Sequence, residues 1–335
     1  MPATSQLRVV AIGGGTGLST LLRGLKRYTA APPGTLPVAS PAPCLIRDLS
    51  AIVTVTDDGG SSGRLREDLN MLPPGDVRNC MVALSEDEHL LSPLCQHRFA
   101  HGDLEGHSFG NLFLAALTEI SGDFAQAVQA GSQILATRGR IYPSTTANAR
   151  LSARMVDGSL VQGETSITAS RQTIAELMLS PADAPPLPGT LDAIAAADLI
   201  TLGPGSLYTS LITNLLVRGI PEALAASQAT RVYICNLMTQ ANESLGLTAA
   251  QHIEKILDHA RSQIFDYALI NTALIRPATL EQYAREGQSP IVADLDRIRA
   301  LGVEPITGNF VHEGDVLRHN YDVLAETVLN LALRR

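Results

Sequence analysis

Two glycine-rich segments of the chain have the composition of loops that bind phosphate groups. Gly13–Gly17 (GGGTG) separates the apolar run VVAI from a stripe of leucines with helical spacing, and Gly203–Ser206 (GPGS) also separates an apolar run from a helical pattern. Glycine lets the backbone approach a phosphate, and the free N–H groups at a helix start attract an anion. We therefore expect both loops to hold a diphosphate. The nucleotide- or phosphate-binding candidates are Gly13, Gly14, Gly15, Thr16, Gly17, Gly203, Gly205 and Ser206.

Neither loop matches a standard nucleotide-binding fingerprint. The third glycine of the dinucleotide pattern would fall at Leu18, and no lysine precedes Ser19 or Thr20 as a Walker A loop requires. No acidic residue follows at a second strand end, about 20 residues on, to hold a ribose, which argues against a dehydrogenase. The competing interpretation is structural: Thr16 and Ser206 cap helices in tight strand-to-helix turns.

A pair of adjacent carboxylates, Asp57-Asp58, opens the segment DDGGSSGR. Adjacent carboxylates beside hydroxyls suit a hydrated Mg²⁺ ion or the hydroxyls of a sugar. Both aspartates are therefore metal candidates and, if the protein is an enzyme, catalytic candidates. The structural alternative is a turn in which Asp57 caps a helix that starts near Ser61.

Two further helix starts carry polar side chains that could face the same ligand. In PPGDVRN, Asp76 is either a helix cap or a ligand contact, and in GHSFGN the same alternatives apply to Ser108. His97 and His101 lie four residues apart, but without a third ligand at suitable spacing we expect both to be solvated. The cleft-lining candidates are Asp57, Asp58, Ser61, Ser62, Arg64, Asp76, Arg78, Asn79, His107, Ser108, Asn111 and Asn236.

The elements that must position these residues alternate between short buried strands and helices. Strands are expected within 7–15, 51–56, 198–202, 231–237 and 267–272, and helices dominate 77–136. This alternation predicts an α/β fold: a Rossmann-like, mainly parallel sheet with helices on both faces. The loops 13–17, 57–63, 203–206 and 236–240 would then meet at the carboxyl edge of the sheet, where ligands bind.

One stretch departs from that alternation. Within residues 149–169, the Asp157-Gly158 turn lies between two semi-alternating segments and predicts a β-hairpin. We expect residues 139–189 to form a small antiparallel-rich lobe inserted into a nucleotide-binding core of residues 1–138 and 190–335. The proline-rich segment 31–43 predicts an irregular surface loop.

Composition excludes several classes of protein. The 335 residues contain 25 Lys+Arg and 33 Asp+Glu, a net charge of −8, and no Trp, so non-specific nucleic-acid binding is not expected. The four cysteines form no CxxC pair, which favours reduced thiols over a zinc site or a disulfide framework. No apolar run approaches the roughly 20 residues of a membrane span, and no signal segment precedes the first strand. We expect a cytoplasmic protein.

The chain resembles the YvcK-like, gluconeogenesis-factor family. The motifs that carry this resemblance are GGGTGLSTLLRGLK, AIVTVTDDGGSSGRLR, PPGDVRNCMVAL, GHSFGNLFLAAL, LGPGSLYTSLITNLLV and VYICNLMTQ. They extend over nearly the whole chain, in order and at matching spacing. The sequence departs from the family after Met238-Thr239-Gln240, where Pro-Gly-Glu-Thr is replaced by Ala241–Ser244 (ANES), which retains Glu243.

The resemblance implies a Rossmann-like core that binds a UDP-sugar, notably UDP-N-acetylglucosamine, and needs no resident cofactor. It implies a regulator of carbon flux, cell-wall precursor supply and cell shape, without established turnover. It is also compatible with a homodimer, and it leaves a role for Mg²⁺ open. The family is related to CofD, the transferase that joins a phospholactyl group to a deazaflavin. The alternative function is therefore a CofD-like transferase that uses a nucleoside diphosphate donor, with Asp57 and Asp58 in the reaction.

Overall fold

The computed structural model describes residues 6–30, 42–86, 90–170, 172–241 and 243–334 of the chain. Most of the proline-rich segment 31–43 therefore lies outside the described residues. In the part of the chain that is described, strands form a seven-stranded sheet, a three-stranded sheet and a two-stranded sheet. None of the described helices is long and apolar enough to cross a membrane.

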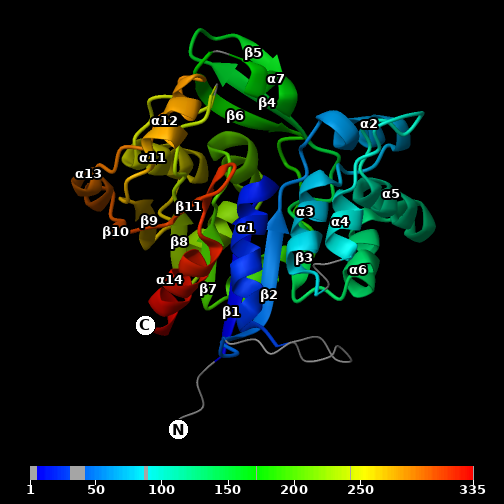
Figure 1. The fold of residues 1–335 in the computed structure, drawn as a ribbon, viewed down its shortest axis with the longest axis horizontal. Coiled ribbons are helices and arrows are strands. Elements are labelled where there is room, and N and C mark those ends of the chain that lie inside the picture. Colours follow the sequence, from blue (N-terminus) through cyan, green and yellow to red (C-terminus); the bar gives the residue numbers. More distant parts are fainter. Residues whose placement is uncertain (1–5, 31–41, 87–89, 171, 242, 335) are drawn as a thin grey trace.

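The main sheet is parallel throughout, with strand order β10-β9-β8-β7-β1-β2-β3 in the described residues (Figure 1). Its strands are β1 (Leu7–Gly13), β2 (Ile46–Val53), β3 (Arg140–Pro143), β7 (Leu199–Leu202), β8 (Thr230–Ile234), β9 (Tyr267–Asn271) and β10 (Glu304–Gly308). Strands β1 and β7 are neighbours at the centre of this order. The connection after β1 leads to β2 on one side, and the connection after β7 leads to β8 on the other side. Such a switch point is where open α/β sheets bind ligands.

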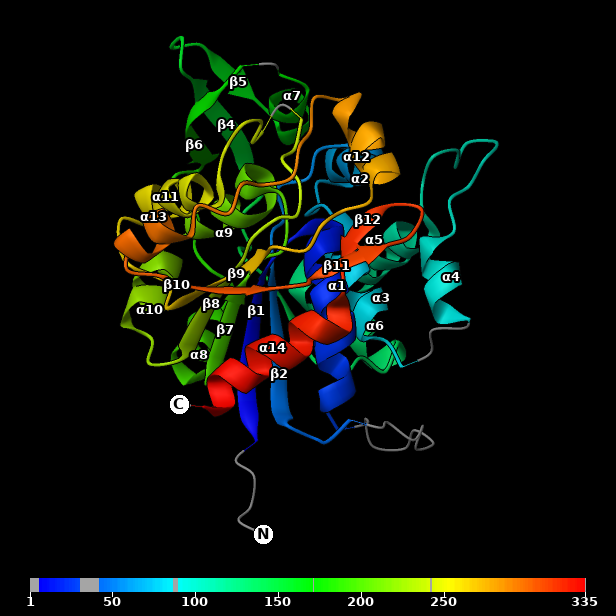
Figure 2. The same ribbon diagram turned by 60° about the vertical axis from the view of Figure 1, so that its left-hand side comes forward.

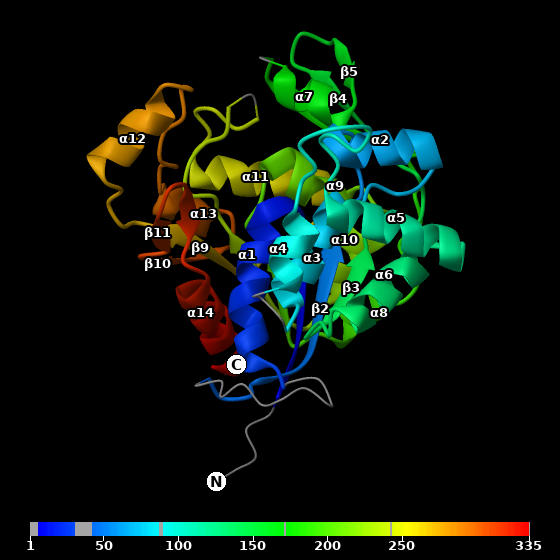
Figure 3. The ribbon, with the colours of Figure 1, turned by 45° about the vertical axis from the view of Figure 1, so that its right-hand side comes forward.

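Helices cover both faces of this sheet, as the alternating pattern predicts (Figures 1 and 3). The described helices are α1 (Gly15–Leu25), α2 (Gly60–Leu69), α3 (Gly75–Leu84), α4 (Leu91–Gln96), α5 (Phe109–Ser121), α6 (Phe124–Ile134), α7 (Glu164–Ala169), α8 (Thr190–Ala196), α9 (Thr213–Leu215), α10 (Ile220–Ala226), α11 (Ala249–Ala260), α12 (Pro277–Ala284), α13 (Leu295–Ala300) and α14 (Tyr321–Leu333), with a 3₁₀ turn η1 (Lys26–Tyr28) and a π-helical segment η2 (Leu207–Ile212).

The core has one cluster on each side of the sheet because successive strand residues point to opposite faces. Val9 and Ala11 of β1 pack in a cluster with α1, α3 and α14. Val10 and Ile12 pack in the other cluster with η2, α10 and α11. The near-continuous apolar composition of β1 follows from this two-sided burial.

The inserted lobe stands above the carboxyl ends of the strands (Figures 1 and 2). It contains the antiparallel sheet β5-β4-β6, formed by β4 (Arg150–Met155), β5 (Leu160–Gln162) and β6 (Ile174–Ser180), together with α7. The Asp157-Gly158 hairpin is confirmed. The lobe starts later than predicted, because Arg140–Pro143 pairs with β2 as the edge strand of the main sheet. Residues 164–169 form a helix rather than the rest of the second hairpin strand.

A small hairpin, β11 (Val311–Glu313) and β12 (Leu317–His319), precedes α14. It places the C-terminal part of the chain next to α1 at the carboxyl edge of the sheet (Figure 2). The predicted strands differ from the observed ones mainly at their ends: β2, for example, begins at Ile46 rather than Ala51. The residues before Ala51 include the charged Arg47 and Asp48. A prediction based on apolar runs therefore misses the first part of this strand.

Candidate ligand-binding site

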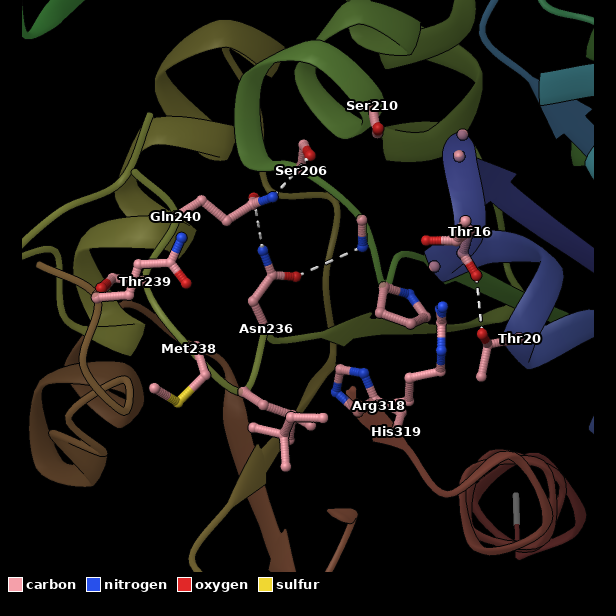
Figure 4. A pocket seen from close by; sticks show the side chains of 18 of the residues that line it. Thr16, Thr20, Ser206, Ser210, Asn236, Met238, Thr239, Gln240, Arg318 and His319 are labelled. Carbon is pink, nitrogen blue, oxygen red and sulfur yellow. Dashed lines mark hydrogen bonds between the residues drawn. The ribbon is translucent and has the colours of Figure 1, made fainter. Parts of the chain in front are cut away.

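Three of the four predicted loops surround one cavity of about 350 Å³ at the carboxyl edge of the sheet (Figure 4). The loops after β1, β7 and β8 supply most of its wall. Its lining consists of Gly14, Gly15, Thr16, Gly17, Thr20, Pro204, Gly205, Ser206, Ser210, Asn236, Leu237, Met238, Thr239, Gln240, Tyr283, Gln288, Leu317, Arg318 and His319. Gly13 and Gly203 belong to the same loops but are not part of this lining.

The loop after β1 brings the start of α1 to the cavity. Helix α1 is capped by Gly14, without a side-chain hydrogen bond, so the predicted cap at Thr16 is wrong: Thr16 lies inside the first turn. The carboxylate of Asp76 accepts the Gly15 N–H. The N–H groups of Thr16 and Gly17 have no acceptor within the helix, and both residues line the cavity. The α1 start thus offers backbone donors to an anion.

Gly17 is required by a close approach between the first two loops. A Cβ atom at Gly17 would lie 2.3 Å from the carbonyl oxygen of Pro204. A Cβ atom at Gly14 would lie 2.4 Å from Thr54 Cγ2 and 2.7 Å from Asp76 Oδ2. Gly17 therefore allows the loops after β1 and β7 to pack together, and Gly14 allows the β1 loop to pack against Thr54 and Asp76.

The loop after β7 differs from the prediction. Ser206 precedes η2 but makes no side-chain capping bond; its Oγ accepts a hydrogen bond from Gln240 Nε2 at 2.9 Å. Glu243 instead accepts the Tyr208 N–H at 3.3 Å and the Thr209 hydroxyl at 2.9 Å. A carboxylate of the chain itself therefore occupies donors at this helix start, so the two helix starts are not equivalent anion sites.

Amides connect the loops after β7 and β8. Asn236 Oδ1 accepts the Gly205 N–H at 3.4 Å, and Asn236 Nδ2 donates to Gln240 Oε1 at 3.3 Å. The backbone N–H of Gln240 donates to Ser244 Oγ at 3.0 Å, so Ser244 of the divergent segment 241–244 holds this loop in place. Figure 4 shows the resulting row of uncharged polar groups from Asn236 through Gln240 to Ser206.

Sequence reasoning missed the residues that close the cavity from the C-terminal side. Arg318 and His319 come from β12, and Tyr283 comes from α12. In Figure 4 the exposed side chain of Arg318 points toward the Thr16 side of the cavity. Burial lowers the pKa of His319 to about 4, and its Nε2 lies 3.1 Å from the Cys235 carbonyl oxygen. None of these residues belongs to a glycine-rich motif, so no local signal marked them.

Asp57 and Asp58 lie outside the lining of this cavity, and their carboxylates have different partners. Asp57 Oδ1 accepts the Gly59 N–H at 2.9 Å, in a turn before α2, whose cap is Gly59 rather than Asp57. Asp58 Oδ1 accepts the N–H and hydroxyl of Thr165 from the lobe. Among the described residues, no group of three or more His, Cys, Asp or Glu side chains is placed to hold a metal ion. Mg²⁺ binding by Asp57 and Asp58 stays a prediction.

The remaining cleft-lining candidates form a second, mostly buried network where α2, α3 and α5 begin. Ser108 caps α5, as one of its two interpretations predicts, and accepts a hydrogen bond from Arg78 at 2.6 Å. Asn111 donates to Ser61 and Ser62, and Ser61 Oγ lies 3.1 Å from His107 Nδ1. Arg78 also donates to Asn79, whereas Arg64 binds the Glu105 carbonyl at the surface. These contacts brace the loops rather than line the cavity.

Two partly buried acids, Asp76 and Glu164, lie near the loops after β1 and β2. Burial raises the pKa of Asp76 to about 6, and the charge of Asp57 adds to that shift while the Gly15 N–H opposes it. Asp76 lies in the first turn of α3 but is not its cap, which is Pro74. Burial and the nearby Asp76 and Asp57 charges raise the pKa of Glu164 in the lobe. Glu164 Oε2 accepts a hydrogen bond from the Thr56 hydroxyl at 3.0 Å. Like charges gathered in a buried region oppose each other's ionisation.

Comparison with known proteins assigns the chain to a family. The sequence pattern described as "2-phospho-L-lactate transferase CofD" matches residues 9–311. The gluconeogenesis factor of Halalkalibacterium halodurans is 48% identical over 323 residues, which cover 96% of this chain and 95% of that protein. The gluconeogenesis factor of Bacillus subtilis is 44% identical over 97% of this chain and 98% of its own. The chain belongs to the YvcK-like branch of the CofD family.

Solved structures of this family share the fold. A crystal structure of a UPF0052-family protein from Bacillus halodurans is 47% identical and superposes with a TM-score of 0.89, covering 97% of this chain and 99% of its own. The predicted Rossmann-like α/β fold is thereby confirmed. The CofD match ends at residue 311, so Arg318 and His319, which close the cavity, lie beyond the part of the chain that matches the transferase pattern.

Proposed function

We propose that the protein is a cytoplasmic regulator that binds a nucleotide-sugar of the UDP-N-acetylglucosamine type. Its output would be control of central carbon metabolism, cell-wall precursor supply and cell shape. The name gluconeogenesis factor, carried by two relatives that match almost the whole chain, supports the metabolic part of this proposal. A sensor needs only different affinities of its conformations for the ligand, so it requires no nucleophile or general base.

The observation that carries the proposal is the division of the cavity into two chemically different ends. At one end, Arg318 and the first turn of α1 offer a cation and backbone donors, which suit a diphosphate. At the other end, Ser206, Asn236 and Gln240 offer hydroxyl and amide groups, which suit sugar hydroxyls. The apolar side chains of Leu237, Met238 and Leu317 complete the wall.

A thermal-shift panel tests this assignment. The panel contains UDP-N-acetylglucosamine, UDP-glucose, UDP, GDP and NAD, each with and without Mg²⁺. A ligand at about 100 times its Kd stabilises the folded state by roughly 2.7 kcal/mol, which raises the midpoint visibly. We expect the shift to be confined to uridine nucleotides and to be largest with the UDP-sugars. The absence of any nucleotide-sugar binding in calorimetry would refute the proposal.

Arg318 provides the matched pair of variants for this panel. Arg318→Ala should weaken UDP-sugar binding by about tenfold or more, because it removes a charge-assisted contact from an otherwise intact cavity. Arg218→Ala is the control, since Arg218 is also an exposed arginine but lies outside the cavity lining. Equal affinity in the two variants would place the ligand elsewhere.

A second candidate function is a CofD-like transfer of a phospholactyl-type group from a nucleoside diphosphate to an acceptor hydroxyl. It is supported by the match over residues 9–311 and by the carboxylate of Asp57 close enough to Asp76 to raise its pKa. Its test is product formation with a deazaflavin acceptor and a nucleoside-diphosphate-linked donor. Turnover that Asp57→Asn abolishes, with Tm unchanged, would favour the enzyme over the sensor.

A further inference from the structure

Glu243 is a buried acid to which the proposed function gives no role. It lies in the loop after β8 and is 9% exposed. Its Oε2 accepts the Tyr208 N–H at 3.3 Å, and its Oε1 accepts the Thr209 hydroxyl at 2.9 Å. The Thr209 N–H is a further donor to the same carboxylate. These are the second and third residues of η2, where a free helix start would otherwise bind an anion.

The start of α1 is occupied to a smaller extent. Asp76 accepts the N–H of Gly15, which is the first residue of that helix. The second and third residues of the helix, Thr16 and Gly17, line the cavity, and their N–H groups have no acceptor within the helix. Arg318 adds a positive charge on that side (Figure 4). The α1 end of the cavity can therefore still bind an anion. At the η2 end, the Glu243 carboxylate already accepts the donors of the helix start.

The groups that face the cavity at the η2 end are uncharged. Ser206 and Ser210 flank the residues that Glu243 holds, and both line the cavity. Gln240 joins Ser206 to Asn236 through hydrogen bonds of 2.9 Å and 3.3 Å. Hydroxyl and amide groups can both donate and accept, as the hydroxyls of a sugar require.

We propose that Glu243 is a specificity-determining residue that makes the cavity favour a diphosphate esterified to an uncharged, hydroxyl-rich group over one that ends in a free phosphate. This inference rests on the proposed nucleotide-sugar function and deepens it. A free terminal phosphate directed toward η2 carries an additional negative charge, which the Glu243 carboxylate held at the start of η2 repels. In a nucleotide-sugar that oxygen is esterified, so the penalty is smaller.

Another acid lies near Glu243. Glu164 of the lobe is close enough that the Glu243 charge contributes to raising its pKa. Burial raises the pKa of Glu243 itself, while the hydrogen bonds from Thr209 and Tyr208 oppose that rise by favouring the ionised form. Binding is therefore measured at pH 8, where ionisation of the carboxylate is favoured.

The test compares the Kd values of UDP and UDP-N-acetylglucosamine by calorimetry. The wild-type protein should bind UDP-N-acetylglucosamine more tightly. Glu243→Gln removes the charge but retains a similar shape, so it should tighten UDP binding by about fivefold and change the Kd of the UDP-sugar by less than about twofold. Glu243→Ala should act in the same direction, and Glu243→Asp, which keeps the charge, should retain the wild-type preference.

Glu222→Gln on α10 is the control for the change in net charge, since Glu222 is exposed and outside the cavity lining. It should leave both Kd values unchanged. A merely structural role of Glu243 would shift both ligands together, and that result would overturn the inference. Equal affinity of the wild-type protein for UDP and the UDP-sugar would also overturn the inference. That measurement does not depend on the folding of any variant. Failure to bind either ligand would instead refute the proposed function.

Discussion

Asp58 in the loop after β2 holds Thr165 at the start of the lobe helix α7: one carboxylate oxygen accepts the Thr165 N–H at 2.8 Å and its hydroxyl at 2.6 Å. Helix α7 has no side-chain cap of its own. Asp58 thus caps it from a residue 107 positions away. The lobe is attached to the ligand edge of the sheet by a capping interaction that local sequence does not reveal.

Asp58→Ala should loosen the lobe while the core remains folded. The loss of a cap costs about 1 kcal/mol, so amides of residues 150–180 should exchange hydrogen faster than in the wild-type protein. Asp58→Asn should be milder because its Oδ1 can still accept a bond. Asp103→Ala, at an exposed loop position, is the control. Unchanged exchange in the lobe of Asp58→Ala would show that other contacts hold it.

Asp76→Asn should stabilise the protein at neutral pH. Asp76 has its pKa raised from 3.8 to about 6, mainly by burial, so the folded state binds the proton more tightly than the unfolded state. The stabilisation from that proton is present below pH 3.8 and lost as pH rises through about 6. The uncharged asparagine avoids this loss, up to about 3 kcal/mol at pH 7.

The measurement is the free energy of unfolding of both proteins between pH 4 and pH 8. The gain should shrink toward zero at pH 4, where the wild-type carboxyl is mostly protonated. Asp183→Asn, at an exposed position, controls for the loss of one charge. A gain of the same size at pH 4 would contradict the explanation by titration.

Gly17→Ala should separate the loops after β1 and β7. The added Cβ would meet the Pro204 carbonyl oxygen at 2.3 Å, and backbone on both sides must shift to avoid it. We expect a loss of about 2 kcal/mol in stability and weaker nucleotide binding. Gly314→Ala is the matched control, because the nearest atom to its Cβ would be 3.8 Å away. If Gly17→Ala is as stable as the wild-type protein, the two loops can move apart at little cost in free energy.

Arg66→Met should destabilise the protein by about 3 kcal/mol in denaturant unfolding. Arg66 is 2% exposed and donates to the carbonyls of Thr56 and Ala149 and to Asn148 Oδ1. A methionine fills similar space but leaves those acceptors without a donor. Arg64→Met on the same helix should cost less than 1 kcal/mol, about the effect of a surface substitution, since Arg64 is exposed. Equal effects would show that burial of Arg66 does not matter.

The sequence by itself determined the α/β fold and the edge at which a ligand would bind. Strands such as β1 are buried on both faces, so they appear as apolar runs, and the glycines that follow them mark close backbone approaches. Alternation with helices then makes the strands parallel and gathers their loops at one edge. The Ser108 cap could also be predicted, because its partner, the Asn111 N–H, is three residues away.

Tertiary structure decided which polar residues act together, because their partners are far apart in the chain. Asp57, Asp76 and Ser206 are not the helix caps that their positions indicate, since Asp76 bonds to Gly15 and Ser206 to Gln240. Asp58 and Glu243 cap helices from which they are separated by 107 and 35 residues. Arg318 reaches the cavity only because the β11–β12 hairpin packs beside α1. Local sequence patterns indicate backbone conformation and burial. Hydrogen bonds between loops at the sheet edge depend instead on which distant segments the fold brings together.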